Sequence, residues 1–287
     1  MKKLNILKAL ALALGVSAFF SCKSTPDLNP VDAFELLDGE GVMYLTVPVK
    51  SNSEFVSSAI QKIAKTEEKD AEKITERLDI AYIEISADSE IKLSASGKIP
   101  TNFVGMALNE KNGWKVNVID NQTVYTHQQT LYQLCMPSSS NAFISHYIEP
   151  MVQKFNEIAY SQQNFENINI QSSAVTEKAY QFLHEKISSD IMIYAPVPKA
   201  FIKAFIGADV KAPVDSIYAV LTPLSNGKEF GLKIIIGLSD SRTVKAACAA
   251  LKLALFPIPA KIVQTASQQI TITDITLSKK EVLSLIR

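Results

Sequence analysis

The chain of 287 residues carries the same order of predicted strands and helices twice, and this repetition constrains its fold more than any other feature. Each copy reads β-α-β-β-α-β with one more strand, so that it closes with a hairpin. In both copies the first strand contains a tyrosine (Tyr44, Tyr194) and ends at a proline (Pro48, Pro196). Because residue identity is otherwise slight, a single larger α+β domain stays open as the alternative to a duplication.

The first copy is predicted from apolar alternation and from residues that begin and end helices. Ser51-Asn52-Ser53-Glu54 fits a capping box ahead of its first helix. The charged segment 65–77 is interpreted as a solvated extension of that helix, and a charged docking face is the alternative. The predicted elements are strands at 42–47, 80–85 and 91–96, helices from residue 55 and at 101–111, and a hairpin of 114–119 with 123–126.

The second copy follows the same signals after residue 190. Ser225-Asn226-Gly227-Lys228 predicts a tight turn between two of its strands, because Asn-Gly favours the left-handed backbone that such turns need. Its predicted elements are strands at 191–195, 216–221 and 230–236, helices at 199–206 and from residue 239 to about 255, and a hairpin of 261–266 with 270–276.

The fold class predicted from this order is α+β, with two tandem ferredoxin-like lobes. Each lobe is expected to have an antiparallel sheet with its helices on one face, and a helix at 140–163 is expected to join the lobes. The cleft between them is then the default binding site. The predicted boundaries are a signal peptide at 1–21, a lipidated cysteine and tether at 22–33, a first lobe at 34–137, a helical connector at 138–187 and a second lobe at 188–287.

The N-terminus has the composition of a secretory signal peptide. Three lysines precede an uncharged apolar run at 9–20, which ends in Ser21 and Cys22. The run is too short for a membrane-spanning helix, which needs roughly 20 residues. An ordinary secretory signal with an incidental cysteine is one interpretation.

Phe19-Phe20-Ser21-Cys22 resembles the lipobox of bacterial lipoproteins, in the loose form familiar from spirochaete lipoproteins. In that class signal peptidase II cuts before a cysteine that already carries a diacylglyceryl group. The resemblance therefore implies that Cys22 is lipidated and that its acyl chains, palmitate among them, attach the protein to a membrane. Two or more acyl chains make a lasting anchor without a transmembrane helix. No family is recognised for the rest of the chain.

The residues after Cys22 indicate where the anchored protein is kept. The polar segment 23–30 contains two prolines and is interpreted as an extended tether. In enteric lipoproteins an aspartate after the cysteine retains the protein in the inner membrane, so Lys23 favours the outer membrane, on its periplasmic or surface face. The chain has 29 basic and 29 acidic residues, and this balance argues against a nucleic-acid partner.

No motif for catalysis, a metal ion or a cofactor is found in the sequence. His127, His146 and His184 are scattered, without the spacing of a zinc site. Cys135 and Cys248 are interpreted as two separately buried thiols, and a single disulfide is the alternative. Ser225 and Lys228 match a serine–lysine spacing of penicillin-binding enzymes, but the turn between them is the preferred interpretation. The aromatic residues that could line a pocket are expected to pack in the core: Tyr82, Trp114, Tyr125, Tyr132 and Tyr218.

The sequence thus predicts a lipid-anchored cell-envelope protein, anchored through Cys22, that binds an unknown protein or small-molecule ligand without catalysis. One alternative is a cell-envelope hydrolase whose site is built from scattered residues. Such an enzyme would show a polar pocket with convergent ionisable groups, whereas a binding protein would show an apolar groove or patch. A second alternative is a structural scaffold that assembles with itself through the edges of its sheets.

Overall fold

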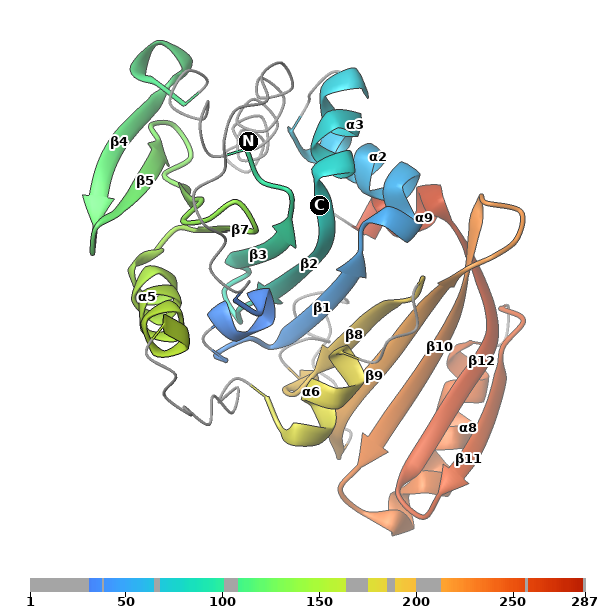
Figure 1. Ribbon diagram of the computed structural model, residues 1–287. Helices are drawn as coiled ribbons and strands as arrows, with labels where there is room; N and C mark the ends of the chain where they lie inside the picture. Colours follow the sequence, from blue (N-terminus) through green and yellow to red (C-terminus); the bar gives the residue numbers. More distant parts are fainter. Residues whose placement is uncertain are drawn as a thin grey trace.

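Twelve antiparallel strands form one continuous sheet in the computed structural model, which describes residues 31–37, 39–64, 68–100, 108–163, 175–184, 189–199, 213–255 and 258–285. The order across the sheet is β11-β12-β10-β9-β8-β1-β2-β3-β7-β6-β5-β4 (Figure 1). The strands are β1 (Met43–Pro48), β2 (Leu78–Ile85), β3 (Ile91–Gly97), β4 (Trp114–Ile119), β5 (Gln122–His127), β6 (Gln133–Cys135), β7 (Asn141–Ser145), β8 (Ile191–Ala195), β9 (Val214–Pro223), β10 (Glu229–Leu238), β11 (Lys261–Ala266) and β12 (Gln269–Ser278).

The helices lie on both faces of this sheet (Figure 1). In the described part of the chain, none of them has the length and apolar character needed to cross a membrane. The α-helices are α2 (Ser53–Ala64), α3 (Glu68–Arg77), α5 (Glu149–Gln163), α6 (Glu177–Leu183), α8 (Val244–Ala254) and α9 (Lys279–Leu285). The short 3-10 helices are η2 (Ala33–Leu36), η3 (Lys50–Asn52), η5 (Glu110–Asn112) and η6 (Ser241–Thr243).

The two halves of the sheet meet at β1 and β8, which are the first strands of the two predicted copies. They pair antiparallel, with Tyr44 opposite Tyr194. From this pair outwards, one half has β2, β3 and the hairpin β5-β4, and the other half has β9, β10 and the hairpin β12-β11. In each hairpin, the strand that comes later in the sequence lies closer to the middle of the sheet. The first half alone has β7 and β6 inserted before its hairpin. The two halves thus share an order of strands, and a duplication of the chain stays a prediction.

The strand order differs from the ferredoxin-like arrangement that the sequence predicts. A ferredoxin-like unit places another strand between its first two strands, whereas β1 pairs directly with β2, from Met43 opposite Ile85 to Pro48 opposite Ile80. Helices α2 and α3 connect β1 to β2, and β2 starts beside the end of β1. The two strands are therefore antiparallel. The β1–β8 pair also makes the sheet continuous, so the halves join edge to edge instead of facing each other across a cleft.

The predicted joining helix at 140–163 is only partly correct. Its first residues form β7, which pairs with β3 and β6, and helix α5 begins at Glu149. The elements β6, α6 and α9 are not in the sequence-based prediction. Most of the predicted helices at 199–206 and 101–111 lie outside the described residues, as do Cys22 and the segment 23–30.

We call the face of the sheet that bears Tyr44 the front face and the opposite one the back face. Directly opposite residues on neighbouring strands point to the same side, so Tyr194 and Tyr218 share the front face with Tyr44. A hydrophobic core covers this face and combines Tyr44 and Tyr82 with residues of η2, α5 and α6. Among its described members none comes from β10, β11 or β12, so this core ends at β9.

Other helices cover the back face. Ile60 of α2 and Ile74 of α3 pack with Ala81 and Ala95 of β2 and β3. Near the middle of the sheet, Phe55 of α2 meets Phe230 of β10 with ring centroids 5.2 Å apart. In the outer part of the second half, Val244 of α8 packs on Ile262, Ile270 and Ile272. The first half is therefore a sheet between two helical layers.

Candidate functional site at the junction of the two halves

A row of three tyrosines crosses the junction on the front face. Tyr44, Tyr194 and Tyr218 lie opposite one another on β1, β8 and β9. The ring centroids of Tyr44 and Tyr194 are 6.4 Å apart, and those of Tyr194 and Tyr218 are 4.8 Å apart. Phe182 of α6 meets the Tyr218 ring edge-on at 5.0 Å. Aromatic side chains thus connect the two halves of the sheet with the helix above them.

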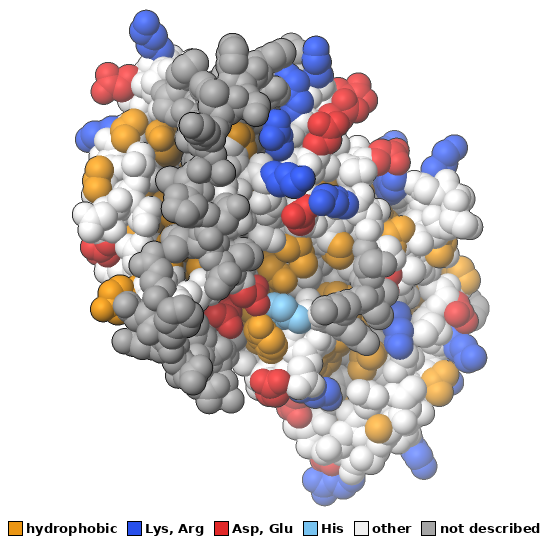
Figure 2. All heavy atoms as spheres, in the orientation of Figure 1, with side chains coloured by type: hydrophobic (Ala, Val, Ile, Leu, Met, Phe, Trp, Pro, Cys, Tyr) orange, Lys and Arg blue, Asp and Glu red, His pale blue; other side chains and the backbone are white. Residues whose placement is uncertain are grey.

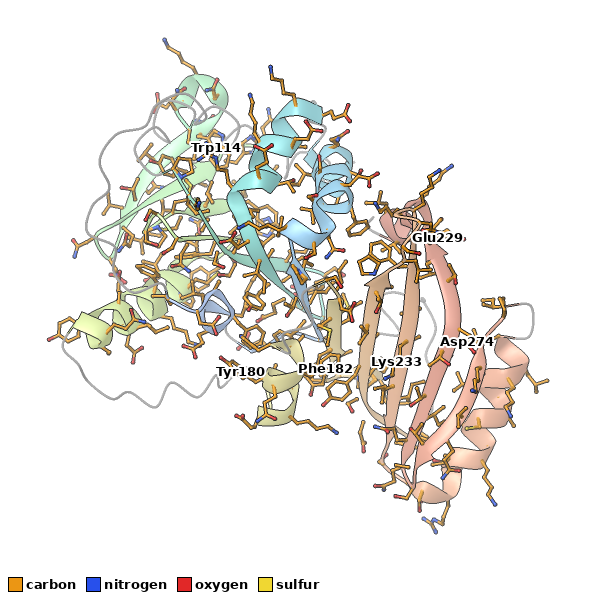
Figure 3. The ribbon with its side chains drawn as sticks, turned by 45° about the vertical axis from the view of Figure 1, so that its right-hand side comes forward. Trp114, Tyr180, Phe182, Glu229, Lys233 and Asp274 are labelled. Atoms are coloured by element: carbon orange, nitrogen blue, oxygen red, sulfur yellow. The ribbon has the colours of Figure 1, made fainter. Side chains whose placement is uncertain are left out.

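Helix α6 supplies the side chains that lie over this row. Thr176 caps its first turn by accepting a hydrogen bond from the backbone N–H of Ala179. Tyr180 and Phe182 then project from α6 beside the junction (Figure 3). Lys178 lies over the Tyr218 ring, with Nζ 5.5 Å from the centroid. Tyr180, Phe182 and Tyr218 remain half-buried, so part of each ring faces solvent.

Asp32 is the acidic group of the junction. Its Oδ1 accepts a hydrogen bond from the N–H of Phe34 and so caps η2, while its Oδ2 accepts from the Tyr180 hydroxyl at 3.0 Å. The same Oδ2 lies 3.1 Å from Nε2 of His184. Burial alone would raise the pKa of Asp32, but these hydrogen bonds and the charge of His184 outweigh it and lower the pKa.

His184 contacts acceptors with both ring nitrogens. Nδ1 lies 3.0 Å from the carbonyl oxygen of Tyr180, and Nε2 faces Asp32. The imidazole stacks on the rings of Tyr180 and Tyr82, with centroids 4.0 and 5.4 Å apart, and meets Phe34 edge-on at 5.0 Å. We call Asp32, Phe34, Tyr82, Tyr180 and His184 the junction cluster. Figure 2 shows hydrophobic side chains around a histidine in this region, with acidic side chains beside them.

Glu35 adds a second carboxyl group close to the junction cluster. It lies in the first turn of η2 and is half-buried. Burial, together with the negative charge of Asp32, raises the pKa of Glu35 to about 6, although Lys154 and His184 act in the opposite direction. The folded protein therefore favours the neutral form of Glu35 more than the unfolded chain does.

The segment 31–37, which we call the post-tether segment, is built into the core beside this cluster. Val31, Phe34, Leu36 and Leu37 are at most 3% exposed. The carbonyl oxygen of Val31 accepts a hydrogen bond from the buried Asn141 side chain, and that of Leu37 accepts one from Lys154. The post-tether segment is thus fastened to both β7 and α5.

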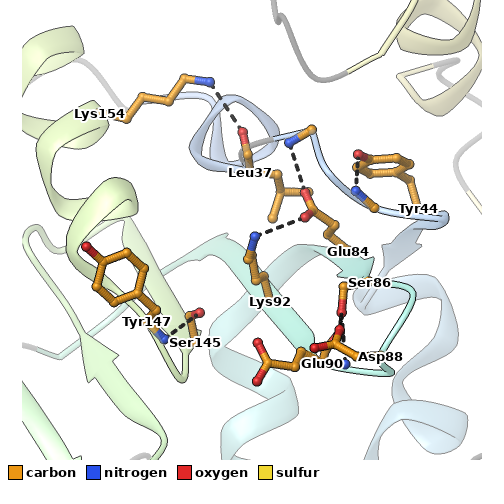
Figure 4. Close-up of polar contacts among 12 residues, drawn as sticks. Leu37, Tyr44, Glu84, Ser86, Asp88, Glu90, Lys92, Ser145, Tyr147 and Lys154 are labelled. Carbon is orange, nitrogen blue, oxygen red and sulfur yellow. Dashed lines mark hydrogen bonds and ion pairs between the residues drawn. The ribbon is translucent and has the colours of Figure 1, made fainter.

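A buried ion pair holds the loop that follows. Glu84 of β2 is fully buried, and it accepts hydrogen bonds from Lys92 Nζ and from the N–H of Gly39, both at 3.2 Å (Figure 4). The N–H of Gly41 donates to the Tyr44 hydroxyl at 2.8 Å. A Cβ atom at Gly41 would lie 2.6 Å from Cγ of Glu84, so the close approach of this loop requires glycine.

The other two histidines lie far along the sheet from the junction. His127 is buried against Trp114, and its Nδ1 accepts from the backbone N–H of Thr130; burial lowers its pKa. Nε2 of His146 lies 3.2 Å from the carbonyl oxygen of Thr130. Its Nδ1 is 3.6 Å from Glu90, which is too long for a hydrogen bond. In the described part of the chain no three His, Cys, Asp or Glu side chains gather as a metal site would require.

The structure also places the other residues that were singled out in the sequence. Cys135 is buried and Cys248 is half-buried on α8, and both are free thiols. The prediction of a turn at 225–228 is confirmed, since Gly227 has a φ of 67° and the Asn226 side chain accepts from the N–H groups of Lys228 and Glu229. Tyr82, Trp114 and Tyr132 are buried as predicted, whereas Tyr125 and Tyr218 are half-buried.

The junction cluster was not predicted from the sequence, in which His184 was considered only as a possible metal ligand. Asp32 and His184 are 152 residues apart, and neither lies in a recognisable motif. The one local signal is Asp32 directly before the apolar η2, because aspartate is a preferred helix cap. The cluster gathers aromatic surface and a histidine–carboxylate pair beside the buried post-tether segment.

Comparison with known proteins identifies the family. The chain matches the sequence model described as "Outer membrane-associated lipoprotein TP0453" over residues 28–283. The chain belongs to the TP0453 family. The predictions of a bacterial lipoprotein and of an outer-membrane location are thereby confirmed. This match also covers the body of the chain, for which no family was recognised from the sequence. No curated protein matches the chain.

Solved structures of TP0453 share the fold. Crystal form III of TP0453 is 18% identical, with a TM-score of 0.66, and the match covers 89% of this chain and 98% of that one. Crystal forms I and IV are each 17% identical, with TM-scores of 0.62 and 0.65 and coverage of 89% of this chain and 96% of theirs. The mixed α+β architecture with an antiparallel sheet is therefore common to this chain and TP0453.

Proposed function

We propose that this TP0453-family protein is held at the outer membrane by acyl chains on Cys22 and binds a protein or small-molecule partner without catalysis. The observation that carries the binding role is the partly exposed aromatic surface at the junction, formed by Tyr180, Phe182, His184 and Tyr218. Aromatic side chains are enriched in the core of interaction surfaces, and a polar rim surrounds that core. Lys178 and Glu177 provide exposed charges beside it.

The ionisable groups of the junction support binding over hydrolysis. A general base needs a ring nitrogen that can accept a proton from a substrate or water. Both nitrogens of His184 are instead within hydrogen-bond distance of Asp32 and of the Tyr180 carbonyl. Burial raises the pKa of the Cys135 thiol to about 12, so it is not a thiolate nucleophile at neutral pH.

Site-specific photo-crosslinking in cells tests the binding role. A photoreactive phenylalanine analogue replaces Phe182, and the matched control places it at Tyr160, an aromatic residue of α5 that is 62% exposed. A discrete adduct is expected at position 182 and not at position 160, and Tyr218→Ala should reduce its yield at least severalfold. Equal labelling at both positions would overturn the proposed surface.

Metabolic labelling with a palmitate analogue tests the anchor. The wild type and Cys248→Ala should both be labelled, because Cys248 lies on α8 in the folded body. Cys22→Ala should lose the label and leave the membrane fraction. Equal labelling of Cys22→Ala and the wild type would show that the acyl chains are elsewhere.

Self-assembly through sheet edges is a second candidate, and the outermost strand β4 favours it. Among the described strands β4 pairs only with β5, and its Val116 and Val118 are 51% and 71% exposed. Unpaired edges that carry exposed apolar residues promote pairing with another chain. Val118→Lys should then abolish a concentration-dependent oligomer in sedimentation experiments, and a protein that is monomeric at every concentration would exclude this role.

A further inference from the structure

Three buried side-chain oxygen atoms lie near the point where β1 ends and β8 begins. They are Oγ1 of Thr46, Oδ1 of Asn52 and Oδ1 of Asp190, and within the described structure none of them has a hydrogen-bond partner. The three residues are buried, with exposures of 3%, 5% and 6%. A buried polar atom without a partner is unfavourable, and a buried carboxylate oxygen is more unfavourable than a neutral one. The fold therefore favours an occupant that satisfies all three atoms.

The pairing of β1 with β8 brings two of these residues together. Thr46 follows Tyr44 by two residues and therefore also lies on the front face. The residue opposite Thr46 on β8 is Met192, two positions after Asp190. Because side chains alternate along a strand, Asp190 shares the front face with Thr46 and occupies the diagonal position on the neighbouring strand.

Asn52 reaches the same region from η3, just after β1. Its Nδ2 donates hydrogen bonds to the carbonyl oxygen of Pro48 at 2.9 Å and to that of Ser189 at 2.8 Å. Ser189 directly precedes Asp190, so the Asn52 amide lies beside the backbone that leads into Asp190. Since a carbonyl oxygen can only accept, these two bonds fix the orientation of the amide and leave Oδ1 as an acceptor.

The donor atoms of this region suit a hard cation. In the part of the chain that the structure describes, no basic side chain forms an ion pair with Asp190. Lys50, two residues before Asn52, pairs with Asp79 instead. Carboxylate and amide oxygens are preferred ligands of Ca²⁺, and oxygen is the donor that hard cations select. With one carboxylate and two neutral oxygens, this set differs from a centre of three His, Cys, Asp or Glu side chains, which the described residues do not form.

We infer that Thr46, Asn52 and Asp190 form a calcium-binding site where β1 meets β8. Ca²⁺ takes about six to eight oxygen ligands in a flexible geometry that water can complete, whereas Mg²⁺ demands a tighter octahedral shell. A single carboxylate implies weak binding, with a Kd of about 10⁻⁴ to 10⁻³ M, as in extracellular modules. The bound ion links β1 and η3 of the first half to the start of β8 and so strengthens the connection between the two halves of the sheet.

Terbium luminescence on the full-length lipidated protein in detergent tests the site. Tb³⁺ occupies calcium sites and emits when a nearby aromatic ring absorbs light, and Tyr82 lies directly opposite Thr46 on β2. The wild type should give emission that millimolar Ca²⁺ displaces and that Mg²⁺ displaces at least about tenfold less effectively. Asp190→Asn should lose this emission. Asp215→Asn, which changes an exposed carboxylate of β9, should retain it.

Thermal denaturation provides a second measurement that uses Ca²⁺ itself. Ca²⁺ should raise the melting temperature of the wild type by a few degrees, because it binds the folded state, and leave that of Asp190→Asn unchanged. If Asp190→Asn fails to fold, Thr46→Val still tests the site, since valine keeps the shape of threonine without its hydroxyl oxygen. Its melting temperature should respond less than that of the wild type.

Several results would contradict the calcium site. They are equal emission from Asp190→Asn and the wild type, loss of emission in Asp215→Asn as well, and displacement by Mg²⁺ as effective as by Ca²⁺. A wild-type melting temperature that ignores Ca²⁺, an equal response in Thr46→Val, or a crystal grown in Ca²⁺ with only water at the three oxygens would each overturn it too.

Discussion

Tyr44 of β1 lies directly opposite Tyr194 of β8, with ring planes 25° apart, at the place where the two halves of the sheet join. Both residues are buried and belong to the core that spans η2, α5 and α6. The pairing turns two groups of strands into one sheet. It also positions the aromatic surface, because Tyr218 packs against the second ring of the pair and Phe182 packs against Tyr218.

Removal of the Tyr194 ring should destabilise the whole protein. Tyr194→Ala is expected to lower the free energy of unfolding by about 3–5 kcal/mol, as for other buried aromatic residues. Tyr147→Ala, at a position that is 63% exposed, should change it by less than about 0.5 kcal/mol. Urea denaturation followed by circular dichroism measures both. A small effect at Tyr194 would mean that the halves are joined mainly by other contacts.

The stability that the buried pair of Glu84 and Lys92 contributes should depend on both partners. Lys92→Met leaves the Glu84 carboxylate buried without its counter-ion, which is expected to cost about 3–5 kcal/mol of stability. The double variant Glu84→Gln with Lys92→Met should recover most of that loss, because the remaining amide can still accept from Gly39. Chemical denaturation of the three proteins tests this coupling, and strictly additive effects would contradict it.

Gly97 should tolerate no side chain, whereas Gly231 should. A Cβ atom at Gly97 would lie 2.1 Å from the backbone oxygen of Arg77, but at Gly231 its nearest neighbour is Cδ2 of Leu224 at 3.5 Å. Gly97→Ala is therefore expected to destabilise the protein by at least about 1–3 kcal/mol. Gly231→Ala should change stability by less than about 1 kcal/mol. Equal melting temperatures for the two variants would refute the argument.

Stability should fall as Glu35 ionises. Its folded pKa of about 6 lies above the ordinary value of 4.5, so the folded state holds the proton more tightly than the unfolded state does. The resulting stabilisation is present below pH 4.5 and is lost as pH rises through 6. Glu35→Gln should consequently raise the melting temperature at pH 7 and leave it nearly unchanged at pH 4. The matched variant at an exposed position of α5, Glu157→Gln, should follow the wild type at both pH values.

Local sequence patterns predicted most strands but not their order. β1 to β5 and β8 to β12 coincide with predicted ranges to within a few residues, because apolar residues there alternate or run without interruption. β6 has three residues, too few for a periodic signal. Phe143 and Ile144 fit a helical stripe with Ile148, and only the pairing of β7 with β3 and β6 makes them a strand.

The candidate site depended on contacts that no local pattern contains. Asp32 and His184 meet because β1 pairs with β8, and that pairing follows from the whole arrangement of the sheet. Glu84 and Lys92 face each other across β2 and β3, and their burial depends on the loop at Gly39. In contrast, the N-terminal lipoprotein signal is contiguous, so it could be recognised without any knowledge of the fold.

The burial of the post-tether segment restricts how the body could be shed from the membrane. Val31 and the residues after it are part of the core, so a protease that cuts there has to unfold the protein first. With the anchor at Cys22 that we propose, a cut that releases an intact body must fall in the short stretch between Cys22 and Val31. A soluble form found outside the cell would therefore begin within those few residues.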